Sequence, residues 1–457
     1  MNRLLSVPAF LALAAFRMEA PLPPAPEAHV VTVSPANMRA NEPGIAVNFK
    51  NPNQVVAVYQ GKATAAYSTD GGKTFTIASG TAPADWRVSG DVSTAFDNKG
   101  HAFLCYMAFD RLGTEAYWAH NAGRNGIFVR RSLDGGKTWE ARAAAIKEFP
   151  TDRAPNIQWE DMPRIFADDA PQSPYAGNLY VGWIEWRLDQ SIMLFSRSTD
   201  DGVTWSKPIR ISTHAGMPRD DNGAVTSFMG VTGGDGTIYA VWNDGDTITF
   251  TRSHDGGKTF EPSRPILRVG PPYFGNVPGV LRVMGFPQIG VSWKRNPRIY
   301  LAWSDYRNGD IDVFAASCAN DGSSCSAPVR VNNDPLHDGA DQFFQWLAVD
   351  PVSGDVYVQF YDRRGDPQNR KTTFTLARST DGGKTFQNFA WTETPFESER
   401  TFLGDYTWLV AYNRHVYGAW TEALPQTNAA TGRAEPSRRG NPTVVRVGTA
   451  DFSRMRN

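Results

Sequence analysis

The stretch Ser-Thr-Asp-Gly-Gly-Lys-Thr-Phe at residues 68–75 decides the fold, because close copies of it recur along the chain. The copies read Ser-Leu-Asp-Gly-Gly-Lys-Thr-Trp (132–139), Ser-Thr-Asp-Asp-Gly-Val-Thr-Trp (198–205), Ser-His-Asp-Gly-Gly-Lys-Thr-Phe (253–260) and Ser-Thr-Asp-Gly-Gly-Lys-Thr-Phe (379–386). A degraded copy, Asn320-Asp-Gly322, stands between Cys318 and Cys325, and the spacing is roughly 55–65 residues. A regular period of this length predicts a repeat architecture.

Each copy predicts a tight turn between two strands. Asp and Ser side chains bond to the backbone of turns, and Gly supplies the positive φ that a tight hairpin needs. The residues before a copy alternate along a strand, as in Ile127-Phe-Val-Arg-Arg-Ser132. We therefore interpret the copies as architectural hairpins and not as catalytic motifs.

The inner strand that opens each repeat and the second strand that follows it can be counted along the chain, and they give seven modules. Many second strands end in an aromatic residue, as in Leu179-Tyr-Val-Gly-Trp183. The last module ends at Thr443-Val-Val-Arg-Val-Gly448 without the turn motif, so it lacks an outer strand. His29-Val-Val-Thr-Val-Ser34 resembles outer strands elsewhere and is predicted to close this module. The sequence predicts an all-β fold, a seven-bladed β-propeller closed by an N-terminal strand; the alternative is six blades.

The octapeptide resembles the Asp-box, or BNR, repeat of sialidase-like β-propellers, and its copies cover roughly residues 41–390. The resemblance implies an exo-glycoside hydrolase on terminal acidic sugars, with a Tyr nucleophile, a Glu partner, an Asp acid/base and Arg residues for the substrate carboxylate. Asp405-Tyr-Thr-Trp-Leu409 looks like the family's segment around the nucleophile. The catalytic candidates are Tyr406, Glu160 and Asp91; Glu185 and Glu399 are the alternatives to Glu160 as the partner of Tyr406.

Two elements depart from the family pattern. Asn41-Glu-Pro-Gly-Ile45 stands where the family has Phe-Arg-Ile-Pro, and the loop 59–67 holds no carboxylate. Two alternatives to a hydrolase therefore stay open. One is a non-catalytic propeller that binds a glycan or a protein, and the other is a lyase that acts on uronate-containing polysaccharides.

Acidic and amide residues stand where the inner strands begin. Aligning the modules places Asn41, Asp91, Asp161, Asp221 and Asp405 at comparable positions, from which their side chains are expected to converge on the axis. Hard oxygen ligands of this kind suit Ca²⁺. The candidate metal ligands are Asp91, Asp161, Asp221 and Asp405, and no other cofactor is expected. A catalytic carboxylate cluster and simple capping of loop backbone are the other interpretations.

Arginines recur on the face of the predicted ring at which the inner strands begin. An acidic residue followed by Arg appears after second strands, as in Glu185-Trp-Arg187 and Asp305-Tyr-Arg307. The Arg fork binds carboxylates in bidentate fashion, so converging guanidinium groups suit an acidic glycan. The candidate substrate-binding residues are Arg187, Arg307, Arg363, Arg400 and Arg164. An ion pair between neighbouring blades is the alternative.

Composition and the N-terminus bound the remaining possibilities. The chain has 457 residues, with 46 Lys and Arg against 47 Asp and Glu, which argues against a nucleic-acid partner. Residues 1–28 read as a signal peptide and a Pro-rich linker, and residues 29–457 as a single propeller domain. We expect a secreted or periplasmic monomer without a membrane span. Cys318 and Cys325 are expected to form a disulfide.

Overall fold

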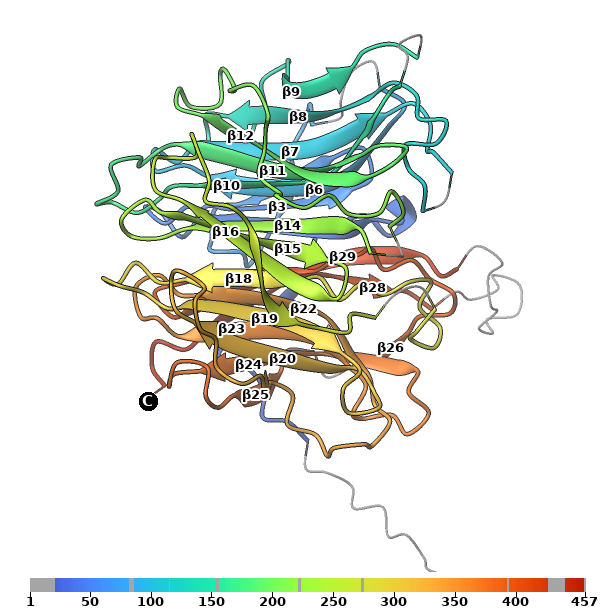
Figure 1. Cartoon of the computed structure of the whole chain (residues 1–457). Coiled ribbons are helices and arrows are strands. Elements are labelled where there is room, and N and C mark those ends of the chain that lie inside the picture. The colour runs from blue at the N-terminus through green and yellow to red at the C-terminus, as the bar shows by residue number, and fades with distance from the viewer. Residues whose placement is uncertain are drawn as a thin grey trace, which may run out of the picture.

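The computed structural model describes residues 21–81, 86–114, 116–152, 156–220, 223–272, 275–392, 394–425 and 440–455. Within them the strands form seven separate antiparallel sheets, and each sheet is one blade of a β-propeller. Figure 1 shows the blades following one another from blue to red. The prediction of a seven-bladed all-β propeller is confirmed.

The inner strand comes first in the first six blades, and the other strands follow in chain order. Blade 1 holds β2 (Asn41–Val47), β3 (Val55–Gln60), β4 (Thr64–Ser68) and β5 (Thr76–Ile77). Blade 2 holds β6 (Val88–Phe96), β7 (Ala102–Phe109), β8 (Asn125–Ser132) and β9 (Ala144–Phe149). Blade 3 holds β10 (Trp159–Ala167), β11 (Leu179–Trp186), β12 (Ser191–Ser198) and β13 (Ile209–Arg210). Blade 4 holds β14 (Val225–Thr232), β15 (Ile238–Asp244), β16 (Thr247–Ser253) and β17 (Arg264–Arg268).

The later blades follow the same order until the ring closes. Blade 5 holds β18 (Gln288–Val291), β19 (Ile299–Asp305), β20 (Asp312–Cys318) and β21 (Val329–Arg330). Blade 6 holds β22 (Gln342–Val349), β23 (Val356–Asp362), β24 (Lys371–Ser379) and β25 (Gln387–Ala390), and β26 (Phe396–Glu397) also pairs with β24. Blade 7 holds β27 (Trp408–Tyr412), β28 (His415–Ala423), β29 (Thr443–Asp451) and β1 (His29–Thr32).

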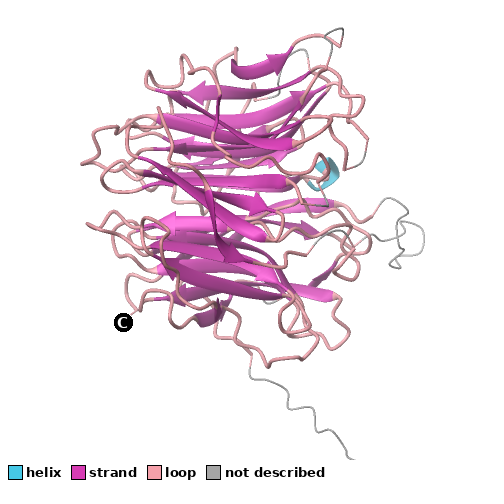
Figure 2. Cartoon of the chain, in the orientation of Figure 1, coloured by secondary structure: helices cyan, strands magenta, loops and turns pink. Residues whose placement is uncertain are grey.

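Helix is almost absent from the described chain. The helical turn in Figure 2 is the short 3-10 helix η1 (Ala36–Met38). None of the described helical structure is long and apolar enough to cross a membrane.

The N-terminal strand closes the ring as the sequence predicted. β1 pairs antiparallel with β29, with Val31 opposite Val447. The pairing extends past the strand, since Val33 N donates to Val445 O at 2.9 Å. The fourth strand of blade 7 therefore comes from the opposite end of the chain. This pairing covers the edge of β29, which would otherwise offer unpaired backbone groups to another chain.

Deleting residues 21–34 is expected to destabilise the protein and to cause self-association. The deletion removes the β1–β29 pairing and the buried Val33, which costs on the order of 3 kcal/mol. It also leaves the β29 edge open. Thermal unfolding and size-exclusion chromatography would measure both effects against a control chain that begins at Pro21. A truncated chain with the control's melting temperature would show that β1 does not hold the ring closed.

The Pro-rich stretch before β1 is docked in the structure, although it was expected to be a linker. Ala390 N donates to Pro23 O at 2.8 Å, and Ala25 N donates to Ala390 O at 2.8 Å. These bonds attach residues 23–25 to blade 6. The predicted signal peptide, up to residue 20, lies outside the described residues.

The repeated turn owes its shape to one Ser and one Asp. The Ser68 hydroxyl donates to Asp70 Oδ1 at 2.7 Å and accepts from Gly72 N at 2.9 Å. The Thr74 hydroxyl donates to Asp70 Oδ2 at 2.6 Å. Burial alone would raise the pKa of Asp70, but hydrogen bonds from Thr74 and Ser68 outweigh it and lower the pKa to about 2. The Asp-to-Thr side-chain bond recurs at Asp134, Asp200, Asp255 and Asp381.

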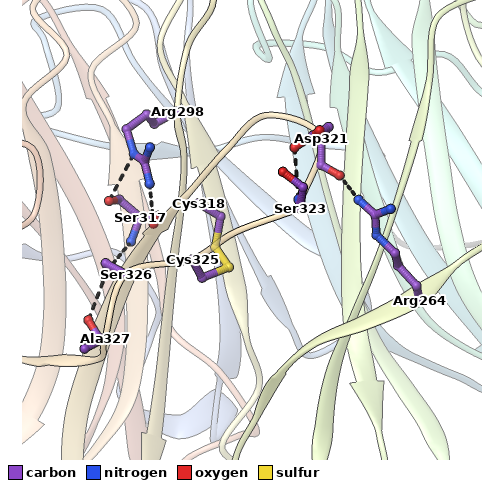
Figure 3. The surroundings of a disulfide bond; sticks show 9 residues. All are labelled: Arg264, Arg298, Ser317, Cys318, Asp321, Ser323, Cys325, Ser326 and Ala327. Carbon is purple, nitrogen blue, oxygen red and sulfur yellow. Dashed lines mark hydrogen bonds between the residues drawn. A yellow bond between two sulfur atoms is a disulfide. The ribbon is translucent and has the colours of Figure 1, made fainter.

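A disulfide replaces this turn in blade 5. Cys318 is bonded to Cys325, which confirms the pairing predicted from sequence. Figure 3 shows the bond beside Ser317 and Ser326, which link the two sides of the loop; Ser317 N donates to Ser326 Oγ at 3.2 Å. Asp321 accepts from Ser323 N at 2.9 Å, and Gly322 N donates to Ala319 O at 2.8 Å across the turn. The covalent link thus stands where the other hairpins use side-chain hydrogen bonds.

Buried tryptophans and close backbone contacts hold neighbouring blades together. Trp183, Trp242, Trp303 and Trp420 near the ends of second strands are fully buried. The Trp303 indole donates to Asp305 Oδ2 at 2.9 Å, and the Trp420 indole donates to Glu422 Oε1 at 2.9 Å. Asp305 and Glu422, near the ends of their strands, therefore fix the orientation of the buried indole rings. At Gly182, any Cβ would lie 2.4 Å from the Phe228 ring of the next blade.

Candidate functional site

A cavity of about 720 Å³ opens where the inner strands begin. Its wall combines carboxylates, guanidinium groups and aromatic rings from blades 1 to 5 and 7. The acidic lining residues are Glu42, Asp91, Asp110, Asp161, Asp220 and Asp405; the basic ones are Arg87, Arg111 and Arg282; the aromatic ones are Phe109, Trp118, Trp159, Phe286 and Phe402. We call this space the axial cavity. It has the size and the mixed lining of a small-molecule site.

A β-bulge in the inner strands aims acidic side chains at the axial cavity. The pairing register shifts between Asn41 and Gly44 in β2 and between Gly90 and Ser93 in β6. At these bulges Glu42 has a φ of 49° and Asp91 a φ of 44°, which are left-handed values that non-glycine residues rarely adopt. Such strained positions concentrate at functional sites.

The bulges also correct the alignment made from sequence. Glu42, not Asn41, occupies the position of Asp91, because the register shift begins one residue earlier in each case. Asp161 stands one position earlier, at the start of the shift in β10, where Met162 takes the positive φ. Asp221 lies outside the described residues.

Asp91 and Asp161 form a contacting pair on the cavity wall. Asp161 is fixed by Met162 N, which donates to its Oδ1 at 3.1 Å, and by the Trp186 indole, which donates to its Oδ2 at 2.9 Å. The Asp91 and Asp161 carboxyl groups are close enough for each to act on the charge of the other. Burial raises the pKa of Asp91 to about 6, and repulsion from Asp405 adds to it. Burial and Asp91 together raise the pKa of Asp161 well above its usual range.

An arginine from blade 5 crosses the mouth to blade 7. Arg282 Nε donates to Asp405 Oδ1 at 2.6 Å, and its Nη2 bonds the other carboxylate oxygen. The guanidinium lies 4.9 Å from the centroid of the Phe402 ring. This bidentate pair uses both oxygens of Asp405. The interaction ties the loop before β18 to the loop before β27.

Tyr406 lies beneath the axial cavity and does not line it. The Arg164 guanidinium carbon stands 3.8 Å from the Tyr406 ring centroid, and Trp346 and Trp408 flank the guanidinium at 5.9 and 5.4 Å. The Tyr406 hydroxyl donates to Val92 O at 3.3 Å. Burial raises the pKa of Tyr406 well above its usual range. In this structure the phenol is a buried neutral donor under a cation.

Glu160, the predicted partner of Tyr406, belongs to a different cluster. Its carboxylate accepts from the Trp183 indole at 2.5 Å and pairs with Lys147 of blade 2 at 3.0 Å. Lys147 also binds Glu185, which holds Arg187 at 2.7 Å. This network joins blades 2 and 3 and does not line the axial cavity. Glu160 therefore lies apart from Tyr406. Asp91 stays close to Tyr406, whose hydroxyl donates to the backbone oxygen of the next residue, Val92, and whose phenol feels the Asp91 charge.

The other predicted arginines also lie apart from the axial cavity. Arg307 pairs with Asp305, two residues earlier in the same blade. Arg363 is fully buried; it donates to Pro278 O at 2.9 Å and also to Asn369 O and the Thr372 hydroxyl. Arg400 is exposed. Arg164 lines a second, smaller cavity of about 230 Å³ that continues along the apolar parts of the inner strands.

Of the predicted aspartates, the described ones are Asp91, Asp161 and Asp405, and they do not offer three ligand atoms to one ion. Both oxygens of Asp405 accept from Arg282, and Asp161 accepts from Met162 and Trp186. Among the described residues, three ligand atoms close enough for one ion occur at Asp97, His101 and Asp201, on the opposite face. There Lys99 already binds Asp201 at 2.6 Å.

The sequence interpretation missed Glu42 and Asp220 as lining residues, whereas Trp118 could be expected from its place in a long loop on the ligand face. Trp118 comes from the long loop after β7, and its indole donates to Asp220 Oδ2 at 3.3 Å. Both missed residues could have been found in the sequence by looking for an acidic residue within one position of the start of each inner strand, because a bulge shifts the alignment by one residue. Glu42 stands beside Asn41 in that register, and Asp220 stands beside Asp221.

Comparisons with known proteins identify no family for this chain and find only structural neighbours of low sequence identity. No family model and no curated protein matches the chain. A protein of unknown function from Dyadobacter fermentans is 14% identical, with 93% of this chain and 98% of that chain covered and a TM-score of 0.48. The Hadza microbial sialidase Hz136 is 16% identical, with 81% and 72% covered and a TM-score of 0.43. An ulvan lyase is 10% identical, with 83% and 91% covered and a TM-score of 0.48.

Some of these structural neighbours are glycan-active propeller enzymes. Their identities and TM-scores are too low to carry over an activity or a residue role. The class that the fold and the cavity define is a seven-bladed β-propeller with an acidic axial cavity. What this cavity does must be argued from its own residues.

Proposed function

We propose that the protein is an exported glycan-active hydrolase whose catalytic groups are Asp91 and Asp161 in the axial cavity. The observation that carries this proposal is the pair of buried, mutually interacting carboxyl groups, Asp91 and Asp161, on the wall of one large cavity. Two carboxyl groups in contact hold one proton between them near neutral pH, because both cannot ionise at low cost. One can then donate a proton while the other accepts one.

In the proposed reaction, the protonated member of the pair gives its proton to the glycosidic oxygen as the C–O bond breaks. Because the two carboxyl groups are adjacent, they act on one face of the sugar. A water molecule adds its oxygen to the anomeric carbon from the face that the departing oxygen leaves, and the ionised member accepts the proton that the water loses. The pair thereby returns to one proton between two carboxyl groups. Trp186 and Met162 N position Asp161 for this role. Half-buried aromatic rings such as Trp118 and Phe402 supply apolar surface for the sugar.

The charges of the cavity argue for a different sugar from the one that the sequence suggested. An acidic sugar needs guanidinium groups that are available to its carboxylate. Six carboxylates line the axial cavity against three guanidinium groups, and Arg282 is already paired with Asp405. We therefore propose a glycan without an acidic group at the cleaved residue.

A panel of chromogenic glycosides tests the proposal. The panel contains neutral glycosides, aminoglycosides, sialosides and uronides, assayed with wild type, Asp91→Asn and Tyr406→Phe. We expect hydrolysis of a neutral or amino glycoside that Asp91→Asn abolishes and Tyr406→Phe retains. Sialoside hydrolysis that Tyr406→Phe abolishes would overturn it in favour of the sialidase-like route. An unsaturated uronide product would establish a lyase, and binding of glycans without turnover would establish a binding propeller.

A further inference from the structure

One carboxylate of the axial cavity has no place in this chemistry. Glu42 is only 3% exposed, and its Oε2 has no hydrogen-bond partner among the described residues. Asp91 Oδ1 is likewise without a partner there. Leaving a buried charged oxygen unsatisfied is costly. Such an atom on the wall of an open cavity indicates a ligand that donates to it.

The backbone holds Glu42 firmly in this position. Gly404, with a φ of +90°, passes so close that a Cβ on it would lie 2.7 Å from Glu42 Cγ and 2.8 Å from Glu42 N. The bulge at Glu42 is therefore clamped from the blade 7 side. A strained, clamped carboxylate without a partner is pre-organised for binding and not for packing.

Two carboxylates and two guanidinium groups surround Glu42, and both guanidinium groups have other partners. The groups that face it from neighbouring elements are Asp91, Asp405, Arg282 and Arg164. Arg282 is occupied by Asp405, and Arg164 is stacked on Tyr406. Burial raises the pKa of Glu42 well above its usual range, and Asp91 and Asp405 add to it. A positive ligand would relieve this repulsion.

The spacing favours an organic cation over a metal ion. The described residues provide three ligand atoms within one coordination sphere at Asp97, His101 and Asp201, and not at Glu42, Asp91 and Asp161. An ammonium group on a sugar ring needs one or two acceptors and leaves the rest of the ring to other contacts. Trp118 and Phe402 offer aromatic faces on the same wall, which also attract cations.

We propose that Glu42, with Asp91 Oδ1 beside it, binds the protonated amine of an amino sugar. The inference rests on the proposed function, since it names the substrate class of the same cavity. Glu42 is a specificity residue in this arrangement, and Asp91 and Asp161 carry the proton transfers.

Three trisaccharides that differ only at carbon 2 test the inference. The chitosan trisaccharide carries an ammonium group, its fully N-acetylated counterpart an acetamide, and cellotriose a hydroxyl. Calorimetric titration of the whole protein with each measures affinity without needing turnover. We expect the chitosan trisaccharide to bind about tenfold tighter or more than the other two. Glu42→Gln is expected to remove the preference. Glu261→Gln, the same exchange at a half-buried ion pair with Arg252 that does not line the axial cavity, is expected to keep it.

Several outcomes would overturn the amine site. They are equal affinity for the three trisaccharides, or a preference that survives in Glu42→Gln. Calcium chloride, added to protein pretreated with EDTA, is a separate arm; binding of Ca²⁺ that displaces the chitosan trisaccharide and is lost in Glu42→Gln would assign the site to a metal. If the protein hydrolyses only neutral glycosides and shows no preference for the amine, the proposed hydrolase function holds and the amine site is wrong. If the protein prefers the amine but hydrolyses no glycoside, the amine site holds and the proposed hydrolase function is wrong.

Discussion

Replacing Asp91 with Asn is expected to abolish turnover while making the folded protein more stable at neutral pH. The catalytic loss should be about 10²- to 10⁴-fold, the usual contribution of a positioned acid or base. The stability gain arises because burial raises the pKa of Asp91 to about 6 from the ordinary 3.8. Ionising this group in the folded protein is therefore costly, and Asn carries no charge.

The pH dependence of this gain follows from the sign of the shift. A carboxyl group whose pKa is raised by folding stabilises the native state below pH 3.8, and this contribution is lost as the pH rises through about 6. The melting temperature of Asp91→Asn should therefore exceed that of wild type above about pH 6 and approach it near pH 4. The gain at neutral pH should be on the order of 1 kcal/mol.

Thermal unfolding at several pH values, together with the glycoside panel, measures both effects. Asp189→Asn, at an exposed position, is the matched control and should change neither. A lower melting temperature of Asp91→Asn at neutral pH would mark Asp91 as a structural residue. Full activity in a folded Asp91→Asn protein would remove the pair from the mechanism.

Replacing Arg282 with Met is expected to cost about 3 kcal/mol of folding free energy. Asp405 is 6% exposed at its side chain, and Arg282 binds both of its oxygens. Removing the cation leaves a buried carboxylate beside Glu42 and Asp91, which is the costly way to break a buried pair. Arg268→Met removes an exposed pair with Asp246 and is expected to cost less than about 1 kcal/mol.

A double-mutant cycle separates this charge effect from packing. Asp405→Asn in the Arg282→Met background should recover part of the lost stability, because the stranded charge is gone. Chemical denaturation of the four proteins supplies the free energies. If the two losses simply add, Arg282 contributes through its contact with Phe402 and not through Asp405.

Much of the architecture could be predicted because it depends on contacts between residues that are close together in the sequence. The Ser–Asp–Thr bonds of a turn such as 68–74 involve residues within six positions of one another. The Cys318–Cys325 bond also closes a short loop. The β1–β29 pairing is long-range, yet the missing outer strand of the last module and an unassigned strand at the N-terminus matched each other.

The site was harder to predict because a strand changes face at every residue. A β-bulge adds one residue and reverses the direction of the side chains that follow. The bulges therefore put Glu42 and not Asn41 at the position of Asp91. Arginines also look alike in sequence: Arg307 is bound by Asp305 and Arg363 by backbone carbonyls, while Arg282 spans two blades to reach Asp405.

The sequence alone determined the all-β class, the seven blades, the hairpin turns and the strand that closes the ring. These features depend on periodicity and on contacts within one hairpin, which neighbouring residues specify. Only the tertiary structure decided that Glu42, Asp91 and Asp161 meet in one cavity while Tyr406 lies under Arg164 and Glu160 joins two blades. Those groups come from separate blades, and their burial and mutual charge exist only once the ring brings the inner strands around one axis.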